Sequence, residues 1–393
     1  MPEKNSDFSP AVKPFNVIQP TEKEFDLFRE LILKELGLIW GKEKIYLLHA
    51  RVHRRLQYHQ LQTFQNYYDF LQSEKNRSEL QFLYNAVTTT KSGFYREKQH
   101  FEFLRSEILP ELKERMIRKH LKLRFWSAGC ARGEEAFNMA MEAHDFLGTK
   151  LISEGGLRIL ASDVNTEVLD SAVKGNYTTE QISPVPEVLR KRYFVSDSDS
   201  DKNNDVLSIR ANIRKLIQFR HFNLMASEYP IATKFQLIFC RNVLYYLDPE
   251  RREQLLNKLV NHLDDQGCLV LGISESGYRL NGMQKLSYCI YRKLMETLLE
   301  GTGLTVKGNC LIQELEPLVK SLGELVESDR NSIQIDLSNV ESIDTAGIQL
   351  LASCRNSALA RGKSFSIALM SDPVREALQI TGLQQIFENN EID

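Results

Sequence analysis

Hydrophobic residues in the first third of the chain recur every three or four positions, the spacing of an α-helix with one buried face. The clearest case starts at Thr21, where Glu24 three residues later completes the capping-box pattern that begins many helices. The apolar stripe that follows consists of Phe25, Phe28, Leu31, Ile32 and Leu36. Similar patterns predict helices over residues 43–58, 63–73, 77–87 and 98–120. We therefore expect a flexible lead-in over residues 1–20 and an all-α N-terminal domain over residues 21–90.

From Leu123 onward, short apolar runs alternate with amphipathic helical segments. Runs that are apolar along their whole length are typical of parallel strands covered on both faces. The predicted strands are LRFWSAG (123–129), LRILASDVN (157–165), FQLIFCRNV (235–243) and GCLVLGISES (267–276). The pattern predicts an α/β, Rossmann-like domain over residues 91–294, in which a ligand binds beyond the carboxyl ends of the strands.

The last 90 residues repeat the alternation of strands and helices on a smaller scale. Residues 295–303 (METLLEGTG) are interpreted as a linker. In the unit over residues 304–393 we expect helices near 311–326, 346–361 and 373–380, and strands at 332–337 and 364–369. The chain is therefore predicted to be multidomain.

The composition and net charge of the chain are those expected of a soluble globular protein. Hydrophobic residues make up 42% and charged residues 26% of the chain, as in a soluble globular protein. The formal charge is −2, which gives the whole chain no field favouring nucleic acid or an anionic membrane. Six scattered cysteines without a CxxC pair, and no long apolar run, favour a reducing, cytoplasmic location without direct membrane insertion. The eight histidines form no ligand cluster, so no metal is expected.

Chemically suggestive residues follow three predicted strands. A run of small residues from Ser127 to Gly133 precedes Glu134, Asp163 ends the next strand, and Arg241-Asn242 ends a third. A glycine turn followed by an acid at the next strand end is typical of a nucleoside site, in which the acid binds both ribose hydroxyls. The run lacks GxGxxG, and two carboxylates open the next helix, which disfavours a pyrophosphate. A positively charged nucleoside such as S-adenosylmethionine fits better. The alternative is a purely structural glycine turn with a helix-capping aspartate.

Several longer motifs resemble the CheR-type methyltransferases, which methylate glutamates of chemoreceptors with S-adenosylmethionine. The resemblance covers about residues 22–294 and rests on five motifs in order: TTTKSGFYREKQHFEFL, WSAGCARGEEAFNMAM, ILASDVNTEVLDSAVKGNY, LIFCRNVLYYLD and LGISES. It implies a class I methyltransferase domain with a small β-subdomain at about residues 193–213.

The resemblance also implies roles for individual residues. Arg96 and Tyr246 match the pair that faces the reacting methyl group, and Thr90 replaces a family asparagine, which puts that contact in doubt. Glu134 matches the acid that reaches the methionine amino group, although its neighbour Glu135 stays open as an alternative. The implied cofactor-binding set is Thr90, Ser92, Arg96, Glu134, Asp163, Asn223, Leu224, Arg241 and Asn242.

Two further regions suggest contacts with other proteins. Residues 22–123 carry 19 Lys/Arg and 14 Asp/Glu, and relatives use an arginine-rich helix here to dock on an acidic receptor bundle; Arg51, Arg54 and Arg55 match it. A solvated helix face is the alternative. Residues 304–393 resemble STAS domains through IQIDLSNVESIDTAGIQLL and LQITGLQQIF. The resemblance places Asp344 and Thr345 in a switch or partner surface, whereas the alternative is a STAS fold that only forms a dimer.

The leading hypothesis is a protein-glutamate O-methyltransferase whose partners are the cytoplasmic helical bundle of a chemoreceptor-like protein and an unknown protein bound by the STAS module. A catalytically weak or inactive signalling scaffold is the alternative, favoured by Thr90 alone. A nucleic-acid methyltransferase would need an NPPY-like motif where CRNV stands, so no nucleic-acid partner is expected.

Overall fold

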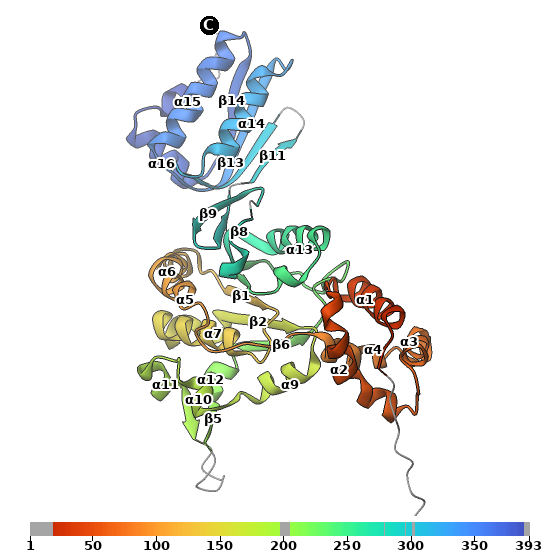
Figure 1. The fold of residues 1–393 in the computed structure, drawn as a ribbon. Helices are drawn as coiled ribbons and strands as arrows, with labels where there is room; N and C mark the ends of the chain where they lie inside the picture. Colours follow the sequence, from red (N-terminus) through yellow and green to blue (C-terminus); the bar gives the residue numbers. More distant parts are fainter. Residues whose placement is uncertain (1–18, 197–204, 279, 295, 301–302, 389–393) are drawn as a thin grey trace, which may run out of the picture.

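The computed structural model describes residues 19–388 except 197–204, 279, 295 and 301–302. A helical domain lies to one side of a large mixed sheet, which has helices on both faces. A second, smaller sheet domain lies beyond one edge of the large sheet (Figure 1). Nearly all of the expected lead-in, residues 1–20, lies outside the described residues.

The helical domain begins as predicted. Helix α1 (Glu22–Leu36) has a complete capping box, because the Thr21 hydroxyl accepts from the Glu24 amide at 3.2 Å and the Glu24 carboxylate accepts from the Thr21 amide at 2.8 Å. All five residues of the predicted apolar stripe are buried. The other helices of this domain are η1 (Lys42–Lys44), α2 (Ile45–Tyr58), α3 (Phe64–Gln72), η2 (Glu74–Asn76) and α4 (Glu79–Val87).

Arg55 was expected on a docking surface, but the structure turns its guanidinium inward. Nη2 and Nε of Arg55 lie 2.5 and 2.7 Å from the carboxylate of the buried Glu79, and the Tyr67 hydroxyl donates to the same carboxylate at 2.8 Å. The guanidinium also lies 3.8 Å from the ring centre of Phe82. Arg55 therefore holds α2 against α4, whereas Arg51 and Arg54 on the same helix are exposed.

The single helix expected over residues 98–120 is interrupted. It consists of α5 (Gln99–Phe103), a π-helical turn η3 (Leu104–Ile108) and α6 (Leu109–Lys119). Pro110 lies in the first turn of α6 and has no amide hydrogen to donate to the preceding turn, which gives the local change in hydrogen bonding a physical cause.

The large sheet has seven strands in the order β6-β2-β1-β7-β8-β10-β9. The five strands from β6 to β8 run parallel, as predicted, but β10 and β9 form an antiparallel hairpin at the far edge that the sequence analysis missed. The strands are β1 (Leu123–Ala128), β2 (Leu157–Asp163), β6 (Ile217–His221), β7 (Phe235–Cys240), β8 (Leu263–Leu271), β9 (Met283–Ser287) and β10 (Ile290–Lys293).

Alternate residues of the central strands enter two different cores. Phe125 of β1 packs in the core shared with α6 and α7 (Glu134–Leu147), whereas Trp126 packs in the core shared with α13 (Pro249–His262). The sheet is therefore covered on both faces. The remaining elements of this region are α8 (Thr149–Ile152), η4 (Ser153–Gly155), α9 (Thr166–Lys174), α10 (Thr179–Ile182), α11 (Glu187–Tyr193), α12 (Ala211–Arg214), η5 (Leu244–Tyr246) and η6 (Ile273–Glu275).

A three-stranded sheet forms the small β-subdomain. Its order is β3-β5-β4, with β3 (Asn176–Thr178), β4 (Phe194–Ser196) and β5 (Val206–Ile209). Strands β4 and β5 lie within the expected residues 193–213, but β3 comes from an earlier segment that the expectation left out. The polar tip between β4 and β5 lies outside the described residues.

The C-terminal domain has a four-stranded sheet in the order β11-β12-β13-β14. Residues 295–303 were expected to be a linker, but Glu296–Glu300 form β11, which pairs antiparallel with β12 (Gly303–Cys310). The apolar run TLL and the downstream glycine fit a hairpin as well as a linker, and the pairing with β12 decides between them. The other elements are α14 (Glu316–Glu327), β13 (Ser332–Ile343), α15 (Thr345–Ala360), β14 (Ser364–Met370), α16 (Asp372–Ile380) and α17 (Gln384–Glu388).

Among the described residues, no helix has both the length and the apolar character needed to cross a bilayer.

We predict that Glu79→Gln lowers the free energy of unfolding by about 2 kcal/mol, because it leaves the Arg55 guanidinium without its charged partner. Burial alone would raise the pKa of Glu79, but hydrogen bonds from Arg55 and Tyr67 outweigh burial, so the net pKa is lowered. The stabilisation is therefore complete above the unfolded-state pKa of 4.5 and is lost as the pH falls through the lower folded-state pKa.

Urea unfolding of both proteins from pH 8 to pH 3 measures the effect. The difference between them should stay constant near neutrality and shrink below about pH 4. Glu74→Gln is the control, since its 3.5 Å ion pair with Arg77 is exposed to solvent. Equal losses in the two variants would contradict the role given to Glu79.

Candidate active site

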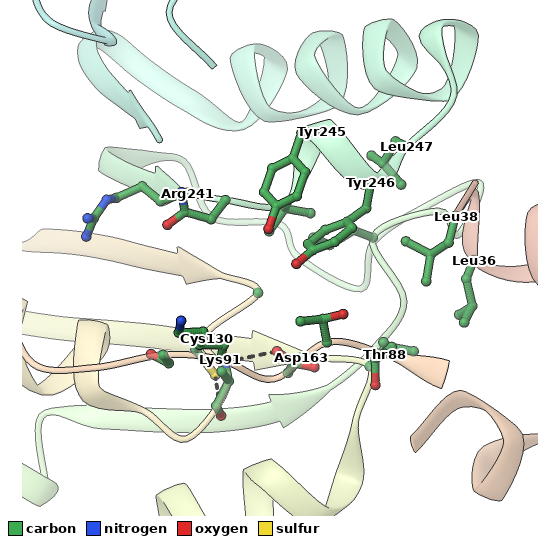
Figure 2. A pocket seen from close by; sticks show the side chains of 18 of the residues that line it. Leu36, Leu38, Thr88, Lys91, Cys130, Asp163, Arg241, Tyr245, Tyr246 and Leu247 are labelled. Carbon is green, nitrogen blue, oxygen red and sulfur yellow. Dashed lines mark hydrogen bonds between the residues drawn. The ribbon is translucent and has the colours of Figure 1, made fainter. Parts of the chain in front are cut away.

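A cavity lies where the carboxyl ends of β1, β2 and β7 face the end of α1 (Figure 2). Its volume is about 210 Å³. Its walls combine residues of the helical domain, such as Trp40 and Lys44, with residues of the sheet. The other lining residues include Leu36, Leu38, Thr88, Lys91, Ser92, Arg96, Cys130, Glu135, Asp163, Asn223, Leu224, Arg241, Asn242, Tyr245 and Tyr246.

Backbone hydrogen bonds fix the helical domain to this wall. The amide of Ile39 donates to the carbonyl of Tyr246 at 2.8 Å, and the amide of Asp248 donates to the carbonyl of Gly37 at 3.2 Å. Gly37 has a φ of +70°, and a β-carbon there would lie 2.7 Å from Arg251 Cδ. Only glycine fits this close approach without strain, so the junction depends on it.

The glycine turn after β1 brings the backbone to the cavity floor. Gly129 has a φ of +81°, and its amide donates to the carbonyl of Ser162 on β2 at 2.8 Å. At the end of β2, the two carboxylate oxygens of Asp163 accept from the amides of Ala131 and Asn165, each at 2.9 Å. Burial raises the pKa of Asp163, and these amides offset the effect only in part. Asp163 is thus held rigidly, with lone pairs left for a ligand's hydroxyls.

The carboxylates of Glu134 and Glu135 differ in their position and in their hydrogen-bond partners. Glu135 lines the cavity, but its carboxylate is occupied by the Ser127 hydroxyl at 2.7 Å and by Arg241 at 3.2 Å. Glu134 is buried just behind the lining, and its Oε2 has no hydrogen-bond partner within the described structure. Burial raises its pKa, and the neighbouring Ser92 and Arg132 offset this only in part. Of the two acids, only Glu134 therefore has a carboxylate oxygen left without a hydrogen-bond partner among the described residues.

Arg241 and Asn242 form the centre of a buried charged network. The Arg241 guanidinium lies 3.1 Å from Glu97 and 3.2 Å from Glu135, and its side chain is 3% exposed. Asn242 has a φ of +60°, and its side-chain amide donates to Glu97 at 3.1 Å. The amide of Ile273, after β8, also donates to Glu97 at 3.2 Å. These residues therefore connect the loop between α4 and α5 with the ends of β7 and β8.

Arg96 and Tyr246 both line the cavity, as predicted. Arg96 is exposed, and its backbone carbonyl accepts a hydrogen bond from Arg241. Tyr95 and Glu97 on either side of it both have positive φ values, which are costly for residues other than glycine and often mark functional loops. The rings of Tyr245 and Tyr246 lie 3.9 Å apart, and Figure 2 shows both hydroxyls pointing into the cavity opposite Asp163 and Cys130.

Most of the predicted cofactor residues therefore meet in one cavity, with qualifications for three of them. Thr90 is not part of the lining, although Thr89 and Lys91 beside it are. Glu134 lies behind the surface, as described. Asn223 lines the cavity, but its side chain donates to the carbonyl of Glu35 in α1 at 2.6 Å and accepts from the amide of Met225 at 2.9 Å. Its side chain thus ties the segment after β6 to the helical domain.

Sequence reasoning missed Glu97, Tyr245 and Trp40 as parts of the site. Glu97 follows Arg96 within the quoted motif, and Tyr245 precedes Tyr246, so proximity to predicted residues was the only available signal. Trp40 belongs to the helical domain, and only the docking of that domain brings it to the cavity. The predicted docking and switch residues lie elsewhere: Arg51 and Arg54 are on α2, and Thr345 is exposed at the first position of α15.

The cavity fits S-adenosylmethionine, the cofactor that the sequence resemblance implies. The unpartnered, buried Oε2 of Glu134 offers a place for an amino group, and Asp163 at the end of β2 offers acceptors for ribose hydroxyls. A cationic ligand suits the acids Glu134, Glu135 and Asp163 better than a phosphate would. The described residues include no group of three or more His, Cys, Asp or Glu side chains arranged for a metal ion.

Comparison with known proteins gives three consecutive family matches. Residues 23–88 match the CheR methyltransferase all-alpha domain, residues 90–290 match the CheR methyltransferase SAM-binding domain, and residues 296–388 match the Mlab STAS domain.

Curated relatives agree. Chemotaxis protein methyltransferase 2 of Pseudomonas aeruginosa is 33% identical over 256 residues, which is 65% of this chain and 87% of that protein. The chemotaxis protein methyltransferase of Borreliella burgdorferi is 30% identical over 276 residues, 70% of this chain and 94% of that protein. That of Escherichia coli is 30% identical over 256 residues, 65% of this chain and 85% of that protein. The chain therefore belongs to the CheR methyltransferase family and is an S-adenosylmethionine-dependent chemotaxis methyltransferase that also carries a STAS domain.

Proposed function

We propose that the enzyme esterifies glutamate carboxylates on the cytoplasmic helical bundle of a chemoreceptor-like protein, and that the enzyme itself is cytoplasmic. The observation that carries the proposal is that Arg96 and Tyr246 both line the cavity, with Tyr246 on the wall opposite Asp163 (Figure 2), and that no general base is required between them. A glutamate carboxylate has a reference pKa of about 4.3 and is already ionised at neutral pH. Bound S-adenosylmethionine supplies a methyl group that its sulfonium has already activated.

The residues of the chain then have two tasks, to align the incoming carboxylate and to exclude water. The Arg96 guanidinium, at the exposed rim of the cavity, is suited to hold one carboxylate oxygen. The hydroxyl of Tyr246 can donate a second hydrogen bond from the same wall. Arg241 binds the backbone of Arg96 and so fixes the loop that carries it.

The scaffold alternative finds little support in the site. Thr90, the departure on which it rests, does not line the cavity. Ser92, Arg96, Asp163, Arg241, Asn242 and Tyr246 all do.

Arg51 and Arg54 provide a surface for the receptor. Both are exposed on α2, and Arg51 donates to the carbonyl of Ala86 at 2.9 Å, which holds its side chain against the end of α4. Among the described residues, Arg54 has no hydrogen-bond or ion-pair partner. Cations held on one helical face are complementary to an acidic helical bundle. With Arg55 committed to Glu79, the proposed docking pair is Arg51 and Arg54.

The STAS domain is proposed to dock a regulatory protein at Asp344 and Thr345. Asp344 accepts from the amide of Gly347 at 2.9 Å, which caps α15, and from the amide of Ile312 at 2.8 Å. The segment after Ile312 contacts the methyltransferase domain, because Gln284 of β9 donates to the carbonyl of Gln313 at 3.3 Å. A partner or a phosphate at Thr345 would thus act on a turn that is hydrogen-bonded to the segment between the two domains.

The junction between the methyltransferase and STAS domains contains a buried acid. Glu314 is 4% exposed and accepts from Gln266 of β8 at 3.4 Å. Burial raises its pKa, and the positive charge of Arg292 opposes this. A small movement that opens the junction to water would therefore lower the cost of burying this acid.

Methyl transfer is tested with methyl-labelled S-adenosylmethionine and host membranes, by counting label that mild base releases as methanol. Methyl esters hydrolyse in base, whereas N-methyl and C-methyl groups do not. We expect Arg96→Ala to lower the base-volatile counts at least 100-fold while S-adenosylhomocysteine binding weakens less than about fivefold, since Arg96 acts on the carboxylate. Arg118→Ala, which removes a 75% exposed guanidinium, is the control. Normal turnover by Arg96→Ala would exclude the role of Arg96.

Docking is tested by the double variant Arg51→Glu, Arg54→Glu with the same membranes. Reversing two charges on the docking face should raise KM for the membranes about tenfold or more and change kcat little. The effect should shrink as salt is added, because the charges are exposed. Arg77→Glu reverses a 74% exposed charge in the same domain and serves as the control. If Arg77→Glu raised KM as much as the double variant, the effect would come from the net charge of the domain and not from the proposed docking pair.

The coupling of the STAS turn is tested by hydrogen exchange in Thr345→Glu. A negative charge at this turn should disturb the Asp344–Ile312 contact and speed exchange in the β9–β10 hairpin about tenfold, which corresponds to about 1.4 kcal/mol. Gln379→Glu introduces the same charge at an exposed position of α16. Identical exchange in both variants would mean that the turn is not coupled to the methyltransferase domain.

A further inference from the structure

A second hollow lies at the opposite end of the large sheet, beside the amino ends of β1 and β2. Its volume is about 520 Å³. Among the described residues, the cationic side chains of Arg124, Arg158 and Lys215 line it, and no aspartate or glutamate does. The rest of the lining is largely apolar and includes Leu160, Ile217, Pro230, Ile231, Ala232 and Phe235.

The pairing of the strands places two of these cations side by side. Arg124 of β1 and Arg158 of β2 are direct neighbours in the parallel register. Because side chains alternate along a strand, both lie on the face of the sheet that also carries Trp126 and Leu160. Like charges at directly opposed positions destabilise a sheet, so this pair opposes the stability of the fold. Burial lowers the pKa of Arg124, and the positive charge of Arg158 lowers it further.

Among the described residues, no carboxylate forms a hydrogen bond or ion pair with either guanidinium. In the described part of the chain, the hydrogen bonds of these guanidiniums go to backbone carbonyls: Arg124 Nη1 donates to Leu123 at 2.8 Å and to Gly155 at 3.1 Å, and Arg158 Nη1 donates to Lys215 at 2.8 Å. These bonds orient the guanidinium groups without neutralising their charge. Arg124 is half-buried, and Arg158 and Lys215 are exposed at the mouth of the hollow.

We propose that this hollow binds the phosphoryl group of a small molecule, and that it is a regulatory site separate from the cofactor cavity. Two fixed guanidiniums offer several N–H donors to one oxyanion, and Lys215 adds a third positive charge. The apolar wall formed by Pro230 and Ile231 gives room for the remainder of such a molecule. The two sites lie at opposite ends of β1, about 16 Å apart from Arg124 to Gly129 at 3.3 Å per residue.

The same chemistry could come from inorganic phosphates or from a nucleotide. Thermal unfolding in the presence of sodium pyrophosphate and, separately, of ADP distinguishes them. Saturating S-adenosylhomocysteine is present throughout, so that adenosine cannot enter the cofactor cavity, and sodium chloride keeps the ionic strength constant. The two probes are compared at one equal concentration, about ten times the Kd of the weaker-binding probe, at which we expect each to raise the Tm of the methyltransferase domain by about 3 °C or more. A larger rise with ADP identifies a nucleotide, and equal rises identify the phosphoryl group alone.

Two variants make the test specific. Arg158→Gln should abolish the rise, and without any probe its Tm should equal or exceed that of the wild type, because it removes a like-charge contact. The double variant Arg124→Gln, Arg158→Gln should also lack the rise. The control, Arg210→Gln, Arg375→Gln, removes two exposed positive charges elsewhere and should keep it.

Three results would overturn the proposal. They are no rise in the wild type, a rise retained in Arg158→Gln, and a rise lost in the control as well as in the double variant. The last of these would indicate a general effect of net charge.

Discussion

The guanidinium of Arg241 is the interaction on which the rest of the active site depends. It is almost fully buried between two carboxylates, Glu97 at 3.1 Å and Glu135 at 3.2 Å, and lies 5.4 Å from the ring centre of Phe101. Buried ion pairs stabilise a fold little unless each charge is fully satisfied, so their value is better sought in the geometry that they impose. Here the three charged groups join the loop between α4 and α5, the end of β7 and the start of α7. Without Arg241, the loop that carries Arg96 would lose the hydrogen bond to the Arg96 carbonyl, and its backbone has positive φ values on both sides of Arg96.

The same network explains which parts of the site the sequence could predict. Glycine, acid and strand-end patterns locate Gly129, Asp163 and Arg241, because local backbone requirements fix those residue types. The partner of Arg241 could not be predicted in this way. That partner, Glu97, also binds Asn242, the neighbour of Arg241. Glu97 and Asn242 are 145 residues apart in the sequence, and only the folded sheet brings their side chains to 3.1 Å.

The elements of the fold likewise divide into those that local sequence signals predict and those that depend on tertiary contacts. Helix α1 carries its own signals, a capping box and an apolar stripe, and its start after Thr21 and its buried face were predicted. Strand β11 was interpreted as a linker because its identity depends on pairing with β12, which a short apolar run does not reveal. Arg55 was assigned to the surface for the same reason, since Glu79, which holds it, lies on another helix. Prediction therefore fails where a residue's environment is set by tertiary contacts.

Besides the proposed receptor docking, the helical domain has a structural role, because it completes the cofactor cavity. Gly37 allows α1 to end against the segment after β7, and Leu36 and Trp40 then form part of the cavity wall. Asn223 reinforces the junction from the sheet side through the carbonyl of Glu35. Docking of a receptor on α2 would therefore act on a domain whose position also determines the shape of the cavity.

The large sheet thus connects three regions of different chemistry. Its carboxyl ends hold acids and a tight glycine turn, which suit a cationic cofactor. Its amino ends hold Arg124 and Arg158 without carboxylate partners among the described residues, an arrangement with the opposite charge preference. Its hairpin edge contacts the STAS domain through Gln284 of β9, and the neighbouring β8 contacts the buried Glu314 through Gln266. Because β1 contributes to both ends of the sheet and β8 contributes to both the STAS contact and the active site, a ligand at any one of these places would contact strands that the others share.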